Sequence, residues 1–243
     1  MSVDEDQLKK LQKWVSRLLP PFLLDRLDPV EKAISEGVAS FSRTLPEDAV
    51  VLDAGAGEAR FRSHFSGRRY IALDSRQGDV SWDYSRLHLV ADLLHLPLRD
   101  GSCDAVLSVV VLEHISDPFR AARELRRVLR PGGRLWLAAP MIWEIHQAPH
   151  DYFRFTRFGL ERLLSTGGFA ITRLVPIGGY FWLVGRYSFY FLKFWRTGLR
   201  AAFLPILSPL FGFLIPLLCY YLDPLDRTGQ YTLGYICEAR KVE

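Results

Sequence analysis

The sequence predicts an α/β fold in which a mostly parallel sheet alternates with helices along the chain. The apolar segment 50–52 indicates a buried strand, and it runs into a glycine-rich turn that contains Gly55 and Gly57. The segment 104–111 is almost wholly apolar, which is typical of a parallel strand covered on both faces. Around these two strands, short apolar segments alternate with helical ones, as strands and their crossover helices do.

The length and composition are those of one folded domain with an insertion or an appendage. The chain has 243 residues, of which 49% are hydrophobic and 24% are charged, and these values exclude bulk disorder. Its three cysteines are widely spaced, which indicates neither a disulfide framework nor a zinc site and fits a reducing cytosolic compartment. The acidic N-terminus lacks the apolar core of a signal peptide, so we expect a cytoplasmic protein.

Two helices are predicted before the first strand, within residues 1–48. Apolar residues in the segment 8–19 recur every three or four positions, which predicts an amphipathic helix that two prolines end. This helix either packs on the domain or a dimer partner, or it binds a surface. The segment 28–31 has the capping residues of a second helix, which we expect to end near Arg43.

The glycine turn after the first strand is a predicted ligand site. Gly55 and Gly57 allow the backbone to turn tightly and to approach a ligand closely. A helix expected at 59–65 would leave free backbone N–H groups in the turn for an anion or a carboxylate. Asp53 would repel a pyrophosphate there but suit a cationic group. A dinucleotide-binding loop would have its third glycine at position 60, which is Arg60, so a nicotinamide cofactor is disfavoured.

Acidic residues end the next two predicted strands. The strand 70–74 ends in Asp74, which follows Gly55 by 19 residues, close to the separation at which an acid receives ribose hydroxyls. Alternatively, Asp74 is a surface acid that caps the following turn. The strand 87–91 is followed by Asp92. The remaining predicted elements are a helix at 119–129, a strand at 134–139, a helix at 159–164, a sixth strand at 169–175 and a seventh at 231–240.

Three sequence motifs resemble those of class I S-adenosylmethionine (SAM)-dependent methyltransferases. Together they cover about 50–140 and are similar to the type 11 branch: Asp53, Gly55, Gly57 and Ala59; Asp-Leu-Leu-His-Leu-Pro at 92–97; and Val-Leu-Glu-His-Ile at 111–115 followed by Arg-Val-Leu-Arg-Pro-Gly-Gly at 127–133. The resemblance implies a Rossmann-like seven-stranded sheet whose last strand is antiparallel, formed by 49–176 and 231–243. It also implies S-adenosyl-L-methionine as cofactor.

The resemblance and the strand ends together give a set of expected cofactor-binding residues. These are Asp53, Gly55, Ala56, Gly57, Asp74, Ser75, Asp92, Leu93, Ser108 and Val109. In this family the acid at position 92 commonly accepts a hydrogen bond from the adenine amino group. Methyl transfer requires no metal, and we expect none.

A hydroxyl or phenol acceptor would require a base, and three histidines are candidates: His114, His146 and His150. The latter two lie in the polar and aromatic loop 141–156. Alternatively, this loop is structural, with Asp151 paired to Arg154 and with Tyr152 and Phe153 packed inward. Glu113 is interpreted as an acid at a helix start, not as a catalytic residue.

The segment 177–230 is predicted to be an insertion between strands six and seven. Its residues 201–222 carry no formal charge and are long enough to span a membrane. Three prolines disfavour a straight helix, and two strands of one sheet require an even number of crossings. We therefore expect shallow helices or a re-entrant hairpin. Six basic residues and no acids within 162–222, beside many aromatic residues, favour contact with a membrane surface through 177–222 over nucleic acid. A lid or a dimer interface remains the alternative.

The sequence therefore predicts a SAM-dependent methyltransferase that acts on a lipophilic or membrane-associated acceptor, from a peripheral position at the inner face of the membrane. One alternative is a soluble small-molecule or sugar methyltransferase with a hydrophobic lid. Another is a non-catalytic, membrane-associated binding module that retains the SAM-binding fold. No nucleic-acid partner is expected.

Overall fold

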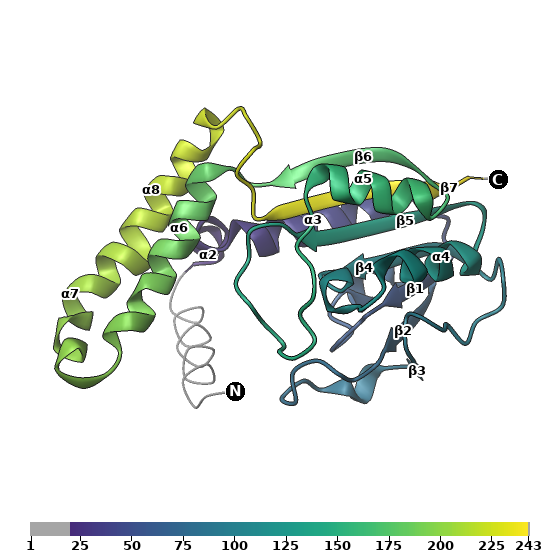
Figure 1. Cartoon of the computed structure of the whole chain (residues 1–243), viewed down its shortest axis with the longest axis horizontal. Coiled ribbons are helices and arrows are strands. Elements are labelled where there is room, and N and C mark those ends of the chain that lie inside the picture. Colours follow the sequence, from purple (N-terminus) through teal and green to yellow (C-terminus); the bar gives the residue numbers. More distant parts are fainter. Residues whose placement is uncertain (1–19, 243) are drawn as a thin grey trace. The chain divides into compact units, whose positions relative to one another are not determined.

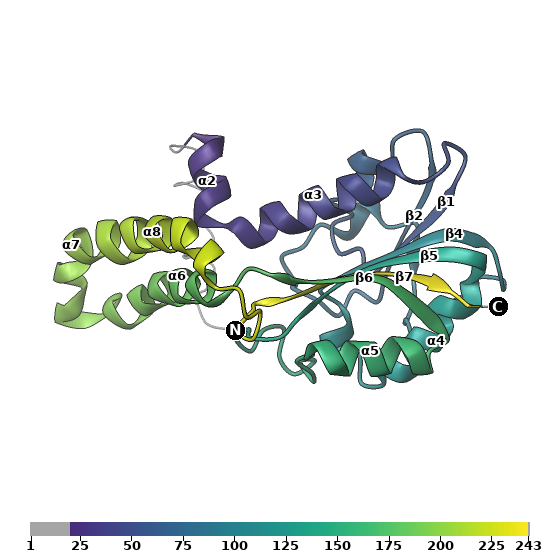
Figure 2. The same ribbon diagram turned by 90° about the horizontal axis from the view of Figure 1, so that it is seen from above.

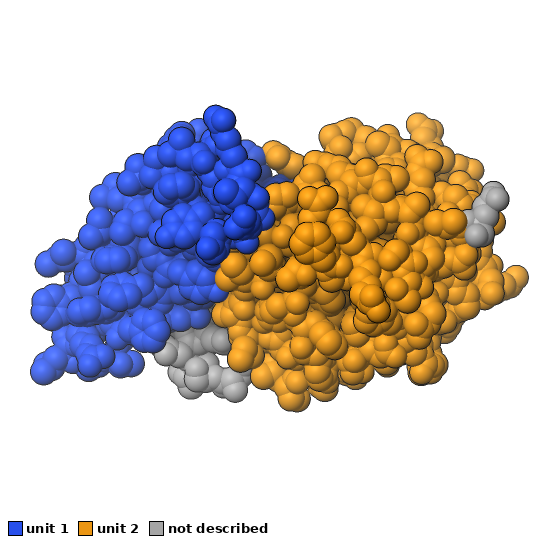
Figure 3. All heavy atoms as spheres, turned by 45° about the horizontal axis from the view of Figure 1, so that its top comes forward, with its two compact units in different colours: residues 1–33, 178–231 blue, residues 34–177, 232–243 orange. Residues whose placement is uncertain are grey.

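The computed structural model describes residues 20–242, and the helix expected at 8–19 lies outside them. The chain divides into two compact units, one of residues 1–33 and 178–231 and the other of residues 34–177 and 232–243 (Figure 3). The insertion expected at 177–230 differs from the segment 178–231 by one residue at each end. The N-terminal region expected as one segment, 1–48, is instead divided between the two units after Ala33.

The larger unit contains a seven-stranded sheet in the order β3-β2-β1-β4-β5-β7-β6 (Figure 1). Its strands are β1 Val50–Ala54, β2 Arg69–Asp74, β3 Leu89–Val90, β4 Cys103–Val109, β5 Leu129–Pro140, β6 Phe169–Ile177 and β7 Gly234–Lys241. The first five strands pair in parallel, whereas β7 lies antiparallel between β5 and β6. This arrangement confirms the predicted Rossmann-like fold class with an insertion before the last strand.

Helices cover both faces of this sheet (Figure 2). Helix α3 (Pro29–Arg43) lies on one face, and α4 (Pro118–Val128) and α5 (Arg157–Thr166) lie on the other. Gly37 lets α3 approach the sheet, because a Cβ atom there would lie 2.8 Å from the buried Trp136 ring in β5. Most residues of β1, β4 and β5 are buried on both faces, and these central strands are accordingly mostly apolar.

Several elements differ from the prediction, among them β5, which begins at Leu129 and not at 134. The helix expected at 59–65 does not form, and only a 3₁₀ segment, η1 Arg62–Phe65, follows the glycine turn. Ala59 has a φ of +55°, a left-handed conformation that interrupts a right-handed helix at its first residue. The third strand, expected at 87–91, has only two residues, β3 Leu89–Val90, and lies at an edge of the sheet.

The smaller unit contains a helical hairpin, which we define as residues 179–226. Helix α6 (Tyr180–Phe191) packs side by side with α8 (Ile215–Leu222), and α2 (Pro21–Leu27) also contacts α8 (Figures 1 and 2). Gly185 allows the close approach, since a Cβ atom there would lie 3.3 Å from the Pro216 backbone. The connecting elements are η4 Leu192–Trp195, η5 Gly198–Phe203, α7 Leu204–Pro209, a π-helical turn Leu210–Leu214 and η7 Asp223–Leu225.

Two carboxylates hold the ends of this hairpin together. Asp223 accepts hydrogen bonds from the backbone N–H groups of Gly179 at 3.1 Å and Trp182 at 2.9 Å, and Asp226 accepts one from Tyr180 at 2.8 Å. These donors are the unpaired N–H groups of the first turn of α6, where negative charge is also favoured by the helix dipole. The residues that follow α8 therefore cap the N-terminus of α6.

The apolar run of the hairpin is helical despite its prolines. Pro205 and Pro216 lie in the first turns of α7 and α8, where the missing N–H costs little, and Pro209 ends α7 before the π-helical turn. Among the described residues, Gly198–Leu225 is one helical stretch long and apolar enough to cross a membrane, and 11% of its most apolar window is buried.

Candidate functional site

The glycine turn links the end of β1 to the residues that follow it. Gly55 has a φ of +88°, and a Cβ atom there would lie 2.4 Å from the Val111 side chain, so no other residue fits. Gly57 has a φ of +53°, and a Cβ atom there would lie 3.2 Å from the Trp82 ring. The turn is thus packed between Val111, which follows β4, and Trp82, which follows β2.

The backbone N–H groups of this turn bond within the protein, which corrects the expectation that they are free. The N–H groups of Gly55 and Ala56 donate to the Leu73 carbonyl oxygen at 2.8 and 2.9 Å. The Gly57 N–H donates to Asp74 Oδ2 at 2.9 Å. Since β2 ends beside the turn and no α-helix begins there, these donors hold the turn against β2.

Asp53 is buried, with 1% of its surface exposed, and accepts a hydrogen bond from the Tyr70 hydroxyl. Burial raises the pKa of Asp53 to about 7, although the Tyr70 hydrogen bond acts in the opposite direction. The sequence had suggested that this carboxylate lies exposed at the glycine turn, but the side chain is buried. Its contact with a cofactor stays a prediction.

Asp74, at the end of β2, has two backbone donors. Its Oδ2 accepts from Gly57, and its Oδ1 accepts from the Arg76 N–H at 2.6 Å. The second bond caps the following turn, as the alternative interpretation proposed, but the first reaches back to the glycine turn. Asp74 is 8% exposed, so it is not a surface acid, and its neighbour Ser75 is half-buried.

The other expected cofactor residues lie at the ends of β3 and β4. Asp92 is exposed, and its Oδ1 accepts from the Leu94 N–H at 2.9 Å, whereas Leu93 is buried in the core. Ser108 and Val109 end β4, beside β1, and both are buried. The Ser108 hydroxyl has no hydrogen-bond partner within residues 20–242. The parallel strands thus bring these positions to one edge of the sheet.

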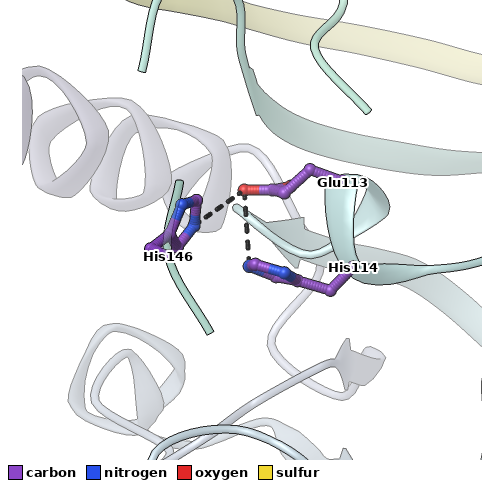
Figure 4. Close-up of side chains that lie close together, drawn as sticks. All are labelled: Glu113, His114 and His146. Atoms are coloured by element: carbon purple, nitrogen blue, oxygen red, sulfur yellow. Dashed lines mark ion pairs between the residues drawn. The ribbon is translucent and has the colours of Figure 1, made fainter. Parts of the chain in front are cut away.

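Beyond β4 lies a cluster of three ionisable side chains, Glu113, His114 and His146, which we call the Glu-His-His cluster (Figure 4). Glu113 is fully buried in η3 (Leu112–His114). Its Oε1 lies 3.8 Å from His114 Nε2 and 3.7 Å from His146 Nε2. The two imidazole rings are nearly perpendicular, with centroids 4.6 Å apart.

A strained residue turns the chain from β4 into η3. Val110 has a φ of +57°, which is costly for a β-branched residue, on the order of 1–3 kcal/mol. Its N–H donates to the Ala138 carbonyl at 2.8 Å, so the strained turn is fixed to β5. Backbone strain of this kind often accompanies functional sites.

The loop 141–156 brings His146 to the cluster. Asp151 Oδ2 accepts from the His146 N–H at 2.9 Å, and both Asp151 oxygens pair with Arg154 at 2.6 and 2.8 Å. This ion pair lowers the pKa of Asp151 to about 2. The predicted Asp151–Arg154 pair is therefore present. The inward packing of Tyr152 and Phe153, which the structural alternative also proposed, is absent, since they are 47% and 37% exposed. Their N–H groups donate to the Glu113 carbonyl oxygen.

Both histidines of the cluster direct Nδ1 away from Glu113. His114 Nδ1 lies 2.6 Å from the His150 carbonyl oxygen, and His146 Nδ1 lies 3.1 Å from the Glu144 carbonyl oxygen. Burial lowers the pKa of His114. Burial also acts to lower the pKa of His146, but Glu113 and the Glu144 carbonyl outweigh it, so that pKa lies above its ordinary value.

The structure brings together two of the three predicted histidines. The His150 ring lies outside the cluster, with Nδ1 3.1 Å from the Tyr152 hydroxyl, and contributes only its carbonyl oxygen. Glu113, interpreted from the sequence as a helix-start acid, is instead the buried centre of the cluster. The available signal was an acid immediately after an apolar run and directly before a histidine.

The strand order, the antiparallel β7, the glycine turn after β1 and the acids at the ends of β2 and β3 define a class I SAM-dependent methyltransferase domain. Within this class, residues 52–137 match the type 11 family model described as a methyltransferase domain. The domain therefore belongs to the type 11 branch, as the motifs predicted, and S-adenosylmethionine is the cofactor of this class.

Curated relatives share this domain but differ in their named substrates. A malonyl-[acyl-carrier protein] O-methyltransferase of Hahella chejuensis is 31% identical over 138 residues, which are 52% of this chain and 50% of that protein. A mouse tRNA (carboxymethyluridine(34)-5-O)-methyltransferase is 33% identical over 115 residues, 45% of this chain and 17% of that protein. The chain thus spans between 17% and half of the length of these relatives.

Solved structures share the fold at low sequence identity. The [4+2]-cyclase SpnF superposes with a TM-score of 0.55 at 19% identity, covering 86% of this chain and 80% of that one. A Haemonchus contortus phosphoethanolamine N-methyltransferase, in complex with S-adenosylhomocysteine, gives a TM-score of 0.52 at 16% identity, with 86% and 52% coverage. One of these proteins is named a cyclase, so fold likeness alone does not define the reaction.

Proposed function

We propose that this chain transfers the methyl group of SAM to a lipophilic or membrane-associated acceptor. The observation that carries this proposal is the apolar surface of the helical hairpin, attached to a methyltransferase domain. In Gly198–Leu225, 11% of the most apolar window is buried, and Leu199 and Ile206 are 95% and 74% exposed. Exposed apolar surface of this extent favours a lipid or an apolar partner over water.

The geometry of the hairpin favours a shallow position in the membrane over a full crossing. Helix α6 has 12 residues, or about 18 Å at ~1.5 Å per residue, and a bilayer core is about 30 Å thick. Lys193, Arg196 and Arg200 lie in the turn of the hairpin, where a deep position would cost about 2.5–3.5 kcal/mol for each charge. At the interface, these residues would meet lipid phosphates.

The capping of α6 by Asp223 and Asp226 keeps both ends of the hairpin together. The chain therefore leaves and returns on the same side of the membrane, as a cytoplasmic sheet requires. The location that we propose is therefore peripheral, at the inner face of the membrane. We do not invoke nucleic acid as a partner, because the basic residues of this segment are interspersed with aromatic and aliphatic ones.

The chemistry of methyl transfer mainly requires positioning. The sulfonium of SAM is a good leaving group, so holding donor and acceptor in line can supply about 7–11 kcal/mol. In the transfer, the methyl carbon–sulfur bond breaks as the bond to the acceptor forms. With an oxygen acceptor, the hydroxyl proton must also leave, and the Glu-His-His cluster is the candidate to receive it.

Turnover assays with methyl-labelled SAM test this function. The full chain is incubated separately with a membrane-lipid extract, a water-soluble metabolite extract and tRNA, and the product is identified by mass spectrometry. Label in a lipid product supports the proposal. Label only in the metabolite fraction favours a soluble acceptor under a hydrophobic lid, and label only in tRNA contradicts the lipophilic acceptor. SAM binding without any turnover favours a non-catalytic module.

A further inference from the structure

We propose that the Glu-His-His cluster binds a divalent transition-metal ion of the Zn²⁺ class, with Glu113, His114 and His146 as its ligands. One ligand atom from each side chain lies within 4.8 Å of the others. Two imidazoles and a carboxylate form a ligand set that zinc and non-haem iron sites use.

The cluster contains buried hydrogen-bond acceptors that no donor in the described part of the chain faces. Both Glu113 oxygens and both Nε2 atoms are buried and have no hydrogen-bond partner among residues 20–242. Each Nδ1 faces a backbone carbonyl oxygen, which only an N–H can bond, so in the neutral form of each imidazole Nε2 carries the lone pair. A buried carboxylate and two lone pairs that face one another are unfavourable unless a cation lies between them.

The distances favour a metal over a shared proton. Glu113 Oε1 lies 3.7–3.8 Å from the two Nε2 atoms, which is too long for a hydrogen bond. Ligand atoms around a tetrahedral zinc ion, with bonds of about 2.0–2.1 Å, are roughly 3.3 Å apart. Glu113 Oε1 and each Nε2 would therefore approach by about 0.4–0.5 Å, and the two imidazole ligand atoms, which lie within 4.8 Å of each other, by at most about 1.5 Å.

The surroundings of the cluster orient its ligands. The carbonyl oxygens of His150 and Glu144 fix the two imidazoles through Nδ1, and Asp151 holds the His146 backbone. Arg154 in turn holds Asp151 through both oxygens. Such outer partners are typical of histidine metal ligands, where they set the tautomer and the ring orientation.

The ligand set also indicates which metal and what it would do. Imidazole nitrogens favour zinc or iron over Mg²⁺ and Ca²⁺, which prefer oxygen ligands. Three protein ligands leave a position for water or another oxygen. If the proposed function holds, an acceptor hydroxyl would bind there and lose its proton more readily. Metal binding itself does not depend on that function.

The test measures metal content and affinity in the full chain, with no acceptor present. Protein is stripped with a chelator and titrated with Zn²⁺ by calorimetry, and stoichiometry is checked by elemental analysis. We expect one bound Zn²⁺ per chain, and its loss in Glu113→Gln, His114→Ala and His146→Ala. Asp151→Asn should bind about 10- to 100-fold more weakly, since it perturbs an outer partner only. His150→Ala is the matched control and should bind as the parent does.

Folding of each variant is verified by its affinity for S-adenosylhomocysteine. A Co²⁺-substituted sample adds a spectroscopic readout, because nitrogen ligation gives visible bands that His146→Ala should alter. The proposal is overturned if the parent binds no Zn²⁺, Fe²⁺ or Mn²⁺, or if folded Glu113→Gln and His146→Ala variants keep full affinity. If His146 is instead an imidazolium paired with Glu113, the parent should bind no metal. If metal binds but no acceptor is methylated, the metal site stands and the proposed function fails.

Discussion

The Asp74 carboxylate joins the end of β2 to the glycine turn, because its Oδ2 accepts a hydrogen bond from the Gly57 N–H at 2.9 Å. Its other oxygen accepts from Arg76 at 2.6 Å. The residue predicted to bind the ribose therefore also shapes the turn that would lie against the cofactor. Loss of its charge should affect both roles.

Asp74→Asn should weaken the binding of SAM and of S-adenosylhomocysteine by about 1.5–3 kcal/mol, the range for hydrogen bonds to a charged group. One backbone donor would also face an amide nitrogen in place of an oxygen. Calorimetry measures the affinity, and the exposed Asp48, changed to Asn, serves as the control. Unchanged affinity in Asp74→Asn would remove this residue from the ribose site, even if the melting temperature falls.

The chain should bind SAM and not NAD. Arg60 occupies the position of the third glycine in a dinucleotide loop, and the turn's Gly55, Ala56 and Gly57 N–H groups are already bonded within the protein. Few donors therefore remain there for a pyrophosphate. Calorimetric titration with both cofactors measures this selectivity, and NAD binding as tight as SAM binding would contradict it.

Much of the fold could be predicted because local sequence signals agree with the tertiary structure. The Asp117–Pro118 start of α4 and the apolar run of β4 each specify one element. The helix after the glycine turn could not be excluded, because the left-handed conformation of Ala59 is imposed by packing around the turn. Local propensity favours a helix there, and tertiary structure overrides it.

The candidate site was less predictable, because it joins residues distant in the sequence. His146 follows Glu113 by 33 residues and lies beside it because the Asp151–Arg154 pair orders the loop that carries His146. No periodicity reveals such a contact. The sequence indicated three histidines by their chemistry, of which two lie in the cluster, and the apolar run before Glu113 was the available indication that this acid is buried. The prolines of the hairpin likewise argued against one straight helix, although two of them lie in the first turn of a helix and the third ends one.

His114→Ala and His146→Ala should lower methyl transfer to an oxygen acceptor on the order of a hundredfold or more, while SAM affinity is unchanged. Either loss removes a group that receives the acceptor proton or, with a metal present, a metal ligand. His150→Ala should have a much smaller effect, because its ring lies outside the cluster. Single-turnover rates with the acceptor identified by labelling give the comparison. Normal rates in both cluster variants would mean that proximity alone drives the reaction.

Asp53 should make the protein less stable as the pH rises. Its pKa is raised from 3.8 to about 7 in the folded state, so folding favours the protonated form. The stabilisation is fully present below about pH 4 and is lost as the pH rises through about 7. The loss is at most about 4 kcal/mol, at about 1.4 kcal/mol for each pKa unit.

Asp53→Asn keeps a neutral side chain that can accept from Tyr70, so this pH dependence should disappear. Urea unfolding between pH 5 and 8 measures it, with Asp48→Asn as the control. We expect the variant to gain stability relative to the parent as the pH increases. Parallel pH profiles for Asp53→Asn and the parent would show that Asp53 is ionised at neutral pH in the folded protein.

The helical hairpin should bind anionic membranes through two separable contributions. Basic residues near the surface add at most about 1 kcal/mol each and weaken with salt, whereas the apolar surface adds a part that salt does not affect. Flotation with anionic liposomes should therefore weaken but persist as ionic strength rises. Complete loss at high salt would indicate a purely electrostatic contact.

Replacement of residues 179–230 by a short Gly-Ser turn should abolish flotation and activity on the lipophilic acceptor. The paired part of β6 ends at Ile177 and that of β7 begins at Gly234, both outside the replaced segment, so the sheet and SAM binding should remain. As a matched variant, Leu199→Glu combined with Ile206→Glu changes two exposed apolar residues of the hairpin and should weaken flotation without shortening the chain. If the shortened protein still floats, the membrane site lies elsewhere, and the segment 8–19 is the next candidate. If the intact protein does not float at low salt, the hairpin is a lid or an oligomer interface.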